Sequence, residues 1–177
     1  MPSIPTHLMV GAALGQAAPE RMRSDWRFWT AAILCSALPD VDVIGFSFGV
    51  QYGDLWGHRG MTHSILFAGL TGMVAALVLG GNRTHLLWNG SLLLAITASH
   101  GLLDAMTNGG LGIAFFSPFD TTRYFLPWQP ILVSPIGAGR FLSARGVNVL
   151  LNEIVVVWVP MILIGLALYT VRRRKEA

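Results

Sequence analysis

One long apolar run decides the environment in which this chain folds. Residues 147–171 contain a single charged residue, Glu153, and are followed at once by the basic tail 172–175, RRRK. A helix of about 20 predominantly apolar residues crosses the hydrocarbon core of a bilayer. Only 12% of the 177 residues are charged, against roughly 25% in soluble domains. The chain lacks the polar surface that a soluble globule needs, so we expect a membrane protein.

Further apolar segments, bounded by glycine, proline or charged residues, precede this run. They predict an all-α fold, a polytopic membrane helix bundle of about four to five membrane-embedded helices, in a single domain of residues 1–177. The predicted helices are residues 5–18, 26–38, 63–79, 85–105 and 147–171. The first would be only about 21 Å long, too short to cross a ~30 Å core upright. It is therefore either half-inserted or tilted.

The segment 108–145 differs from the predicted helices because it is rich in glycine, proline and aromatic residues and has no clear period. Aromatic side chains concentrate at the boundary between membrane and water. We therefore expect an interfacial loop, anchored by Phe115, Phe116, Phe119, Tyr124, Phe125 and Trp128.

The basic residues orient the predicted helices and do not form a nucleic-acid-binding face. They are scattered or lie at helix ends, although the net charge is +3, so we expect membrane lipids and no nucleic acid as partners. Placing the tail 172–175 in the cytoplasm puts most lysines and arginines on the inner side. With the helices crossing the membrane alternately from there, we predict a multi-pass protein of the plasma membrane with a cytoplasmic C-terminus. The same arrangement also brings the polar helix ends to one outer face, with His7, Asp40, Asp42, His58, His63, His100 and Asp104.

The segment 57–64, GHRGMTHS, holds two imidazoles, a guanidinium and two hydroxyls just before an apolar run. On one regular helix, a spacing of five would separate His58 and His63 by about 140°, so they would not share a small ligand. Gly57 and Gly60 allow a loop instead, in which His58 folds back over His63 at the start of the next helix. This arrangement predicts a metal site built from local sequence.

Two further pairs of polar residues lie at predicted helix ends. His100 and Asp104 are four apart and share one helix face, and ionisable residues at membrane depth usually mark a site; a hydrogen-bonded helix-end pair is the alternative. Asp40 and Asp42 follow Pro39, and in an extended segment alternate side chains point the same way. Two adjacent carboxylates repel unless a cation or proton lies between them; a solvated helix terminus is the alternative.

Imidazoles and carboxylates together suit zinc, manganese or iron, whereas sites made only of oxygen ligands suit calcium or magnesium. We therefore expect a divalent metal ion, with zinc first and manganese or iron as alternatives. The expected ligands are His7, Asp40, Asp42, His58, His63, His100 and Asp104. This set exceeds what one tetrahedral ion needs. Two arrangements stay open, one ion with supporting residues or two ions.

These motifs resemble those of a known family. LPDVD at residues 38–42, HRGMTHS at 58–64 and SHGLLD at 99–104, with His7, Gly109-Gly110 and Pro118, are similar in type and order to the YdjM-like family of bacterial inner-membrane proteins. The resemblance covers residues 6–120. It implies a membrane-bound metal-dependent hydrolase of the inner membrane and leaves the substrate open.

In such a hydrolase the ion would lower the pKa of a bound water from about 16 toward about 7. We expect Asp42 as general base and Arg59 as the contact for an anionic group such as a phosphoester, with contact to lipid headgroups as the alternative for Arg59. The interfacial aromatic loop fits a lipid-linked substrate. One alternative is a non-catalytic membrane protein whose metal or His/Asp cluster is structural and locks the helix ends. A metal transporter ranks last, because helices 63–79 and 147–171 offer few polar residues along a path. An open coordination position would distinguish a catalytic site from a structural one.

Overall fold

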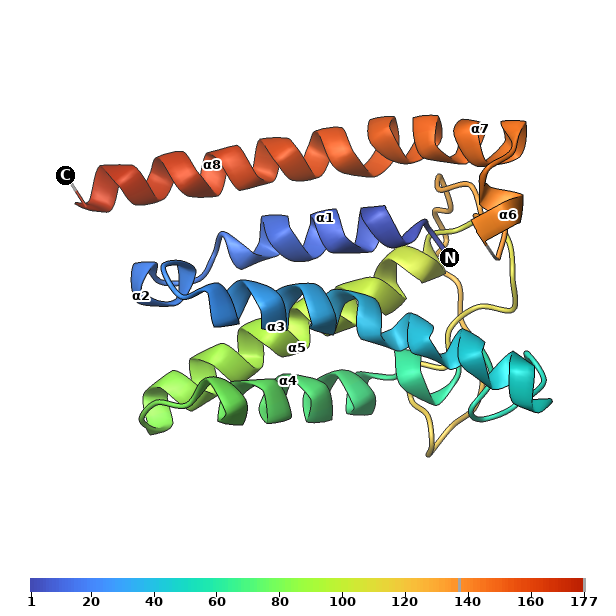
Figure 1. Cartoon of the computed structure of the whole chain (residues 1–177), viewed down its shortest axis with the longest axis horizontal. Helices are drawn as coiled ribbons and strands as arrows, with labels where there is room; N and C mark the ends of the chain where they lie inside the picture. The colour runs from blue at the N-terminus through green and yellow to red at the C-terminus, as the bar shows by residue number, and fades with distance from the viewer. Residues whose placement is uncertain (137, 177) are drawn as a thin grey trace.

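The chain is a bundle of helices, seen in a computed structural model that describes residues 1–136 and 138–176 (Figure 1). Residues 137 and 177, which belong to the predicted loop and the predicted domain, lie outside the described residues. Within the described residues there is no β-strand, only two isolated bridges, Thr107 with Ile131 and Ile113 with Tyr124. The elements in chain order are α1 (Ile4–Gly15), α2 (Glu20–Arg23), α3 (Trp26–Ala37), the 3₁₀ helices η1 (Leu38–Phe48) and η2 (Met61–His63), α4 (Ile65–Leu79), α5 (Arg83–Ala105), α6 (Ala138–Phe141), α7 (Ala144–Glu153), the π-helix η3 (Ile154–Trp158) and α8 (Val159–Glu176).

The long helices run side by side, and α7, η3 and α8 form one continuous rod along α1 (Figure 1). The N-terminus lies at one end of the bundle, with the loops between α5 and α7. The C-terminus lies at the other end, with α2 and the turn between α4 and α5. Among the described residues, three helical stretches are long and apolar enough to cross a membrane, Trp26–Phe48, Arg83–Ala105 and Ala144–Val171; Ile4–Gly15 and Ile65–Leu79 are shorter apolar helices. The predicted fold class, an all-helical membrane bundle, is confirmed.

Local sequence sets where several helices begin. Asp25 accepts a hydrogen bond from the backbone N–H of Arg27 (2.9 Å) and so caps α3, and Asn82 caps α5 in the same way. Ser64 accepts from the N–H of Phe67 (3.1 Å) and starts α4. Side chains of these types satisfy N–H groups that have no partner within the helix. The structure starts α4 at Ile65 and α5 at Arg83, where the sequence predicted residues 63 and 85, and it ends α1 at Gly15 rather than at residue 18.

The segment after α3 differs from the prediction. Pro39 was expected to end the helix and leave Asp40 and Asp42 extended, but the chain continues as the 3₁₀ helix η1. Proline is tolerated here because it stands in the first turn, where its missing N–H is not needed. With three residues per turn, side chains two apart diverge by about 120°. The prediction that Asp40 and Asp42 point the same way is therefore wrong.

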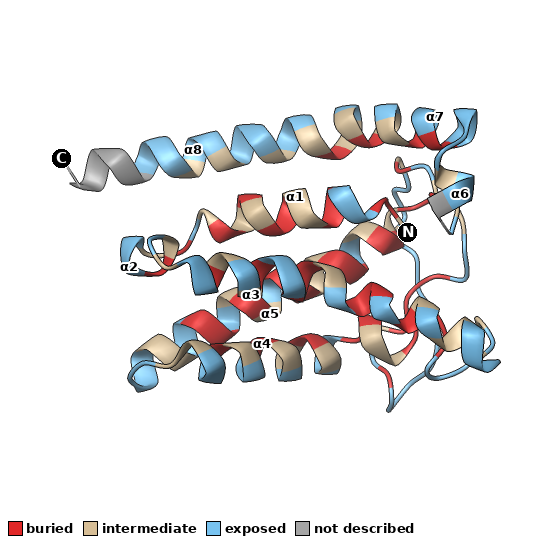
Figure 2. Cartoon of the chain, viewed as in Figure 1, coloured by how far each residue is buried: buried red, intermediate tan, exposed pale blue. Residues whose placement is uncertain are grey.

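The helices pack closely where residues are small. A Cβ atom added at Gly72 of α4 would lie 2.5 Å from the backbone N of Leu94 and 2.8 Å from the carbonyl O of Gly90, both in α5. Glycine thus allows the two backbones to approach, as is common between membrane helices. Buried residues face the inside of the bundle, whereas the outer faces of α4 and α8 are exposed (Figure 2). These exposed faces are apolar, as a lipid environment requires.

We expect Gly72→Ala to destabilise the protein by about 1–3 kcal/mol, because its methyl group meets backbone atoms that move only with the helices. Unfolding in detergent, followed by circular dichroism, measures the loss. Gly69→Ala is the matched control, since its Cβ would meet only the Leu94 side chain at 3.8 Å. Equal stability of the two variants would contradict the close contact between α4 and α5.

Candidate metal centre

All seven predicted ligands gather at the end of the bundle that carries the N-terminus. Asp40 and Asp42 come from η1, His58 from the following loop and His63 from the end of η2. The last turns of α5 supply His100 and Asp104, and the first turn of α1 supplies His7. All seven side chains are buried. Segments far apart in the sequence therefore deliver their polar residues to one enclosed place.

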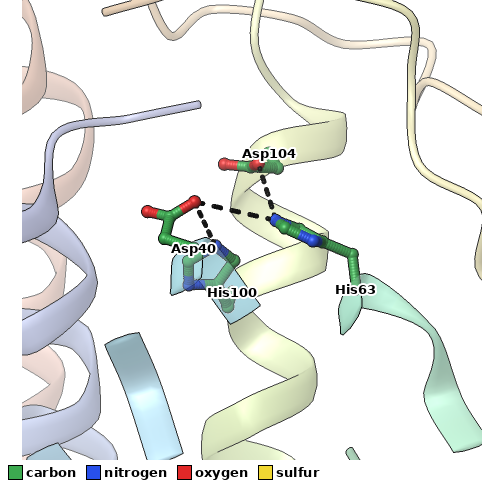
Figure 3. A group of neighbouring side chains, drawn as sticks. All are labelled: Asp40, His63, His100 and Asp104. Carbon is green, nitrogen blue, oxygen red and sulfur yellow. Dashed lines mark ion pairs between the residues drawn. The ribbon is translucent and has the colours of Figure 1, made fainter. Parts of the chain in front are cut away.

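Four of these residues face one another, namely Asp40, His63, His100 and Asp104 (Figure 3). Nε2 of His100 lies 3.3 Å from Oδ1 of Asp40. Nε2 of His63 lies 3.8 Å from the same oxygen and 3.5 Å from Oδ2 of Asp104. One ligand atom from each of the four residues can be chosen so that all lie within 4.8 Å of one another. The group spans three separate elements, η1, η2 and α5.

The unpaired atoms of this group fit a metal ion. Both carboxylate oxygens of Asp40 and Asp104, and Nε2 of His63 and of His100, are buried without a hydrogen-bond partner. Leaving buried polar atoms unpaired is costly. Ligands bound at ~2.1 Å to one tetrahedral ion lie ~3.4 Å apart, close to the separations of 3.3, 3.5 and 3.8 Å observed here. The donor set and its spacing therefore suit one divalent ion.

A backbone carbonyl fixes the tautomer of His100. Nδ1 of His100 lies 2.8 Å from the carbonyl oxygen of Ser36. Since a carbonyl only accepts hydrogen bonds, Nδ1 carries the proton and donates it. The lone pair is then left on Nε2, the atom that faces Asp40. This is the usual support of a metal-binding histidine, in which the outer nitrogen donates to an oxygen.

Asp42 lies behind His63, on the side away from the group of four. Its Oδ2 is 3.2 Å from Nδ1 of His63 and accepts a hydrogen bond from Oγ1 of Thr62 at 2.7 Å. The same oxygen accepts from the backbone N–H of Arg59, and Oδ1 is 2.7 Å from Nδ1 of His58. Both oxygens of Asp42 therefore have partners, unlike those of Asp40. The geometry favours Asp42 as the residue that orients His63.

His63 stands between carboxylates on both sides of its ring. Burial alone lowers the pKa of His63, but the neighbouring Asp104 and Asp42 outweigh it and raise the pKa to about 9. The ring of His58 lies edge to face with it, with centroids 5.4 Å apart. The loop 57–64 thus folds His58 back toward His63. The acidic surroundings favour a cation at this position, either a proton or a metal ion.

Arg59 approaches the same carboxylate oxygen of Asp104 that faces His63. Its guanidinium is completely buried, and its two terminal nitrogens donate to Oγ1 of Thr107 (2.9 Å) and to the carbonyl of Gly109 (2.8 Å). The remaining Nε lies 3.2 Å from Oδ2 of Asp104. Arg59 also has a positive φ of 67°, an uncommon conformation for a residue other than glycine. All three nitrogens of the guanidinium are directed at protein atoms, so Arg59 joins Asp104 to the segment 107–109.

His7 lies directly beside the group of four. Its ring stacks on that of His100, with centroids 3.6 Å apart and planes 12° from parallel. Its Nε2 is 3.4 Å from Oδ1 of Asp104, and neither ring nitrogen has a hydrogen-bond partner. His7 therefore stands where it can complete the ligand set.

Sequence reasoning did not assign a role to Thr107, Ser36 or Glu153. The contacts of Thr107 and Ser36 depend on how the chain folds back, and no local pattern signals them. Glu153 did carry a signal, because an acidic residue inside a membrane helix is costly and usually has a partner. It is completely buried.

The fold and the buried His/Asp group define a helical membrane protein with a candidate metal centre at one end. The sequence profile of the YdjM inner membrane protein family matches residues 1–176, and the chain belongs to that family. The chain is also 36% identical over 173 residues to inner membrane protein YbcI of Escherichia coli K12, with 94% of this chain and 96% of that relative covered. No solved structure matches the chain.

We expect Asp42→Asn to weaken metal binding about 10- to 100-fold, because the neutral amide supports His63 less well than a carboxylate. Competition titration against a chelating dye of known affinity measures this change. Asp120→Asn, at an exposed acid in the loop after α5, is the control and should retain the affinity. If Asp42 acts only as general base, Asp42→Asn will bind metal as the unmodified chain does.

Proposed function

We propose that this protein is a multi-pass, metal-dependent hydrolase of the inner membrane, with its metal centre at the outer face. Asp40, His63, His100 and Asp104 would hold the ion, zinc first and manganese or iron as alternatives, with His7 as a further ligand. The observation that carries this proposal is the convergence of their unpaired buried atoms at separations of 3.3–3.8 Å.

One ion, rather than two, suits the arrangement best. A second group, Asp42, His58 and His63, also comes close enough to hold a metal. However, His63 belongs to both groups, and Asp42 already accepts hydrogen bonds from Thr62 and the backbone of Arg59. Both oxygens of Asp42 and Nδ1 of His58 are thus already paired, and beyond the shared His63 the unpaired atom of this group is Nε2 of His58. We assign it the role of supporting the first.

The contacts of the site assign a separate role to each supporting residue. When bound, the ion would supply Lewis-acid chemistry and make a water molecule more acidic. Ser36 keeps the lone pair of His100 directed at the ion, and Asp42 orients His63. Arg59 holds Asp104 in place. The hypothesis that Asp42 is the general base and that Arg59 contacts an anionic substrate is less consistent with these contacts, because both side chains are already engaged.

An apolar groove supports a lipid-linked substrate, such as a lipid phosphoester. It lies between α3 and α4, has a volume of about 660 Å³, and is lined mainly by apolar side chains. At one end are Leu38 and Phe67, close in the sequence to Asp40 and His63. A lipid tail in this groove would keep its head group near the metal centre. Membrane lipids would then be both partners and substrates.

The burial of the site favours a second candidate function. Even the most exposed of the four residues, Asp40, has only 6% of its surface accessible. Structural metal sites are closed by four protein ligands, whereas catalytic sites keep a position for water. The alternative is therefore a non-catalytic membrane protein in which the metal joins η1, η2 and α5.

The orientation in the membrane follows from the same proposal. The C-terminus and α2 lie at the end of the bundle away from the metal centre (Figure 1). Arg21, Arg23 and Arg83 also belong to this end. Positively charged loops remain preferentially in the cytoplasm, so we propose a cytoplasmic C-terminus.

We expect the detergent-purified protein to contain about one equivalent of divalent metal and to lose it in His63→Ala and in His100→Ala, because each variant removes one of the four ligands. Elemental mass spectrometry measures the content. His85→Ala is the matched control, since this histidine lies in the first turn of α5, far from the centre along the same helix. Absence of metal from the wild type after reconstitution would disprove the proposal.

We expect the metal-loaded protein to hydrolyse a phosphodiester, and His63→Ala to reduce the rate to the metal-free background, because water activation needs the ion. The assay uses bis(p-nitrophenyl) phosphate and, separately, phospholipid vesicles analysed for released head group. His85→Ala should keep the full rate. Stoichiometric metal without turnover on either substrate would favour the structural alternative.

A further inference from the structure

Glu153, the single charged residue in the apolar run 147–171, is completely buried at the start of α1. Its Oε1 accepts a hydrogen bond from the backbone N–H of Ser3 at 2.6 Å. Its Oε2 accepts from the hydroxyl of Thr6 at 2.6 Å and also from the hydroxyl of Ser3. α1 has no acidic residue in its own first turn. Glu153 supplies from another helix the negative charge that a helix N-terminus favours.

The direction of these hydrogen bonds is fixed by Trp158. Its Nε1–H, which can only donate, lies 2.7 Å from Oγ1 of Thr6. Thr6 accepts this bond, and its own proton is then free to go to Glu153. The chain Trp158–Thr6–Glu153 is therefore complete, and Glu153 is absent from the buried side chains that lack a partner. A satisfied polar network of this kind holds its members in one arrangement.

The π-helix η3 brings the side chains of Glu153 and Trp158 to Thr6 of α1. Glu153 and Trp158 are five residues apart, which on an α-helix would separate them by about 140°. The intervening segment is η3, with its i→i+5 hydrogen bonds, so residues five apart come to lie nearly above one another. Such segments are frequent at functional sites. The irregular turn thus aims Glu153 and Trp158 at the same residue of α1.

The residue after Thr6 is His7, which connects this network with the metal centre. Adjacent residues on a helix point about 100° apart. Thr6 faces the rod, while His7 faces α5, where it stacks on His100 and approaches Asp104. His7 has no hydrogen-bond partner of its own to hold its ring. Besides the stacking on His100 and the approach to Asp104, the position of the ring depends on the rotation of α1, which the bonds of Thr6 to Glu153 and Trp158 restrain.

We propose that Glu153 is a positioning residue of the metal centre, which acts through Thr6 to place His7 against Asp104 and His100. This inference rests on the proposed function, because it assigns His7 as a ligand of the bound ion. It extends the centre to the last helical rod, which supplies no ligand among its described residues.

The test is a double-mutant cycle on metal affinity, with the full-length protein in detergent and zinc as the probe. It compares the wild type with Glu153→Leu, His7→Ala and the double variant. We expect Glu153→Leu to weaken zinc binding about tenfold in the wild-type background, as is typical for supporting residues. In the His7→Ala background it should have no further effect, since residues that act through one another are not additive.

Two further variants keep the result interpretable. Asn152→Leu removes the contacts of the neighbouring residue with Leu132 and Pro130, and should destabilise the rod without changing zinc affinity. Thr6→Val removes the hydroxyl that joins Glu153 to α1, and replaces Glu153→Leu in the cycle if that variant does not fold.

The outcomes separate this inference from the proposed function. A wild type that binds no zinc, manganese or iron disproves both. If the wild type binds metal and Glu153→Leu lowers the zinc affinity equally in the wild-type and His7→Ala backgrounds, only the role of Glu153 is overturned. The same holds if His7→Ala binds zinc as tightly as the wild type.

Discussion

The structure depends on a group of acidic and imidazole side chains that face one another without hydrogen bonds between them. Two carboxylates, Asp40 and Asp104, lie within a buried space shared with His63 and His100. Burial removes their hydration, and like charges at this range repel. A cation between them relieves both costs. The surrounding contacts, from Ser36 to His100 and from Arg59 to Asp104, hold the atoms at the separations that such a cation needs.

Two irregular helical segments, η1 and η3, position the side chains of this site. η1 directs Asp40 to His100 and Asp42 to the back of His63, which an extended segment would not do. η3 directs Glu153 and Trp158 to α1. The regular helices below pack through small residues such as Gly72. The regular helices therefore serve the packing of the bundle, whereas the irregular turns η1 and η3 serve the geometry of the site.

Much of the fold and of the candidate site was open to prediction. Apolar runs indicated the helices, since only helices and closed barrels satisfy their backbone in a bilayer. Threading them alternately brought His7, Asp40, His63 and Asp104 to one end, as the structure does. The prediction for Asp40 and Asp42 is wrong, because Pro39 does not end the helical path and the chain continues as the 3₁₀ helix η1.

By itself, the sequence determined the environment, the helical class and the end of the bundle at which the polar residues meet. These depend on hydrophobic length and on the order of segments, which are local properties of the chain. Only the tertiary structure decided which carboxylate faces the centre and which stands behind a histidine, and that Glu153 of α7 accepts hydrogen bonds from the start of α1. Those assignments depend on contacts between segments up to 152 residues apart, as Thr6 and Trp158 are. No local pattern specifies the partners of these residues, because the partners depend on the form of each helix and on its rotation about its own axis.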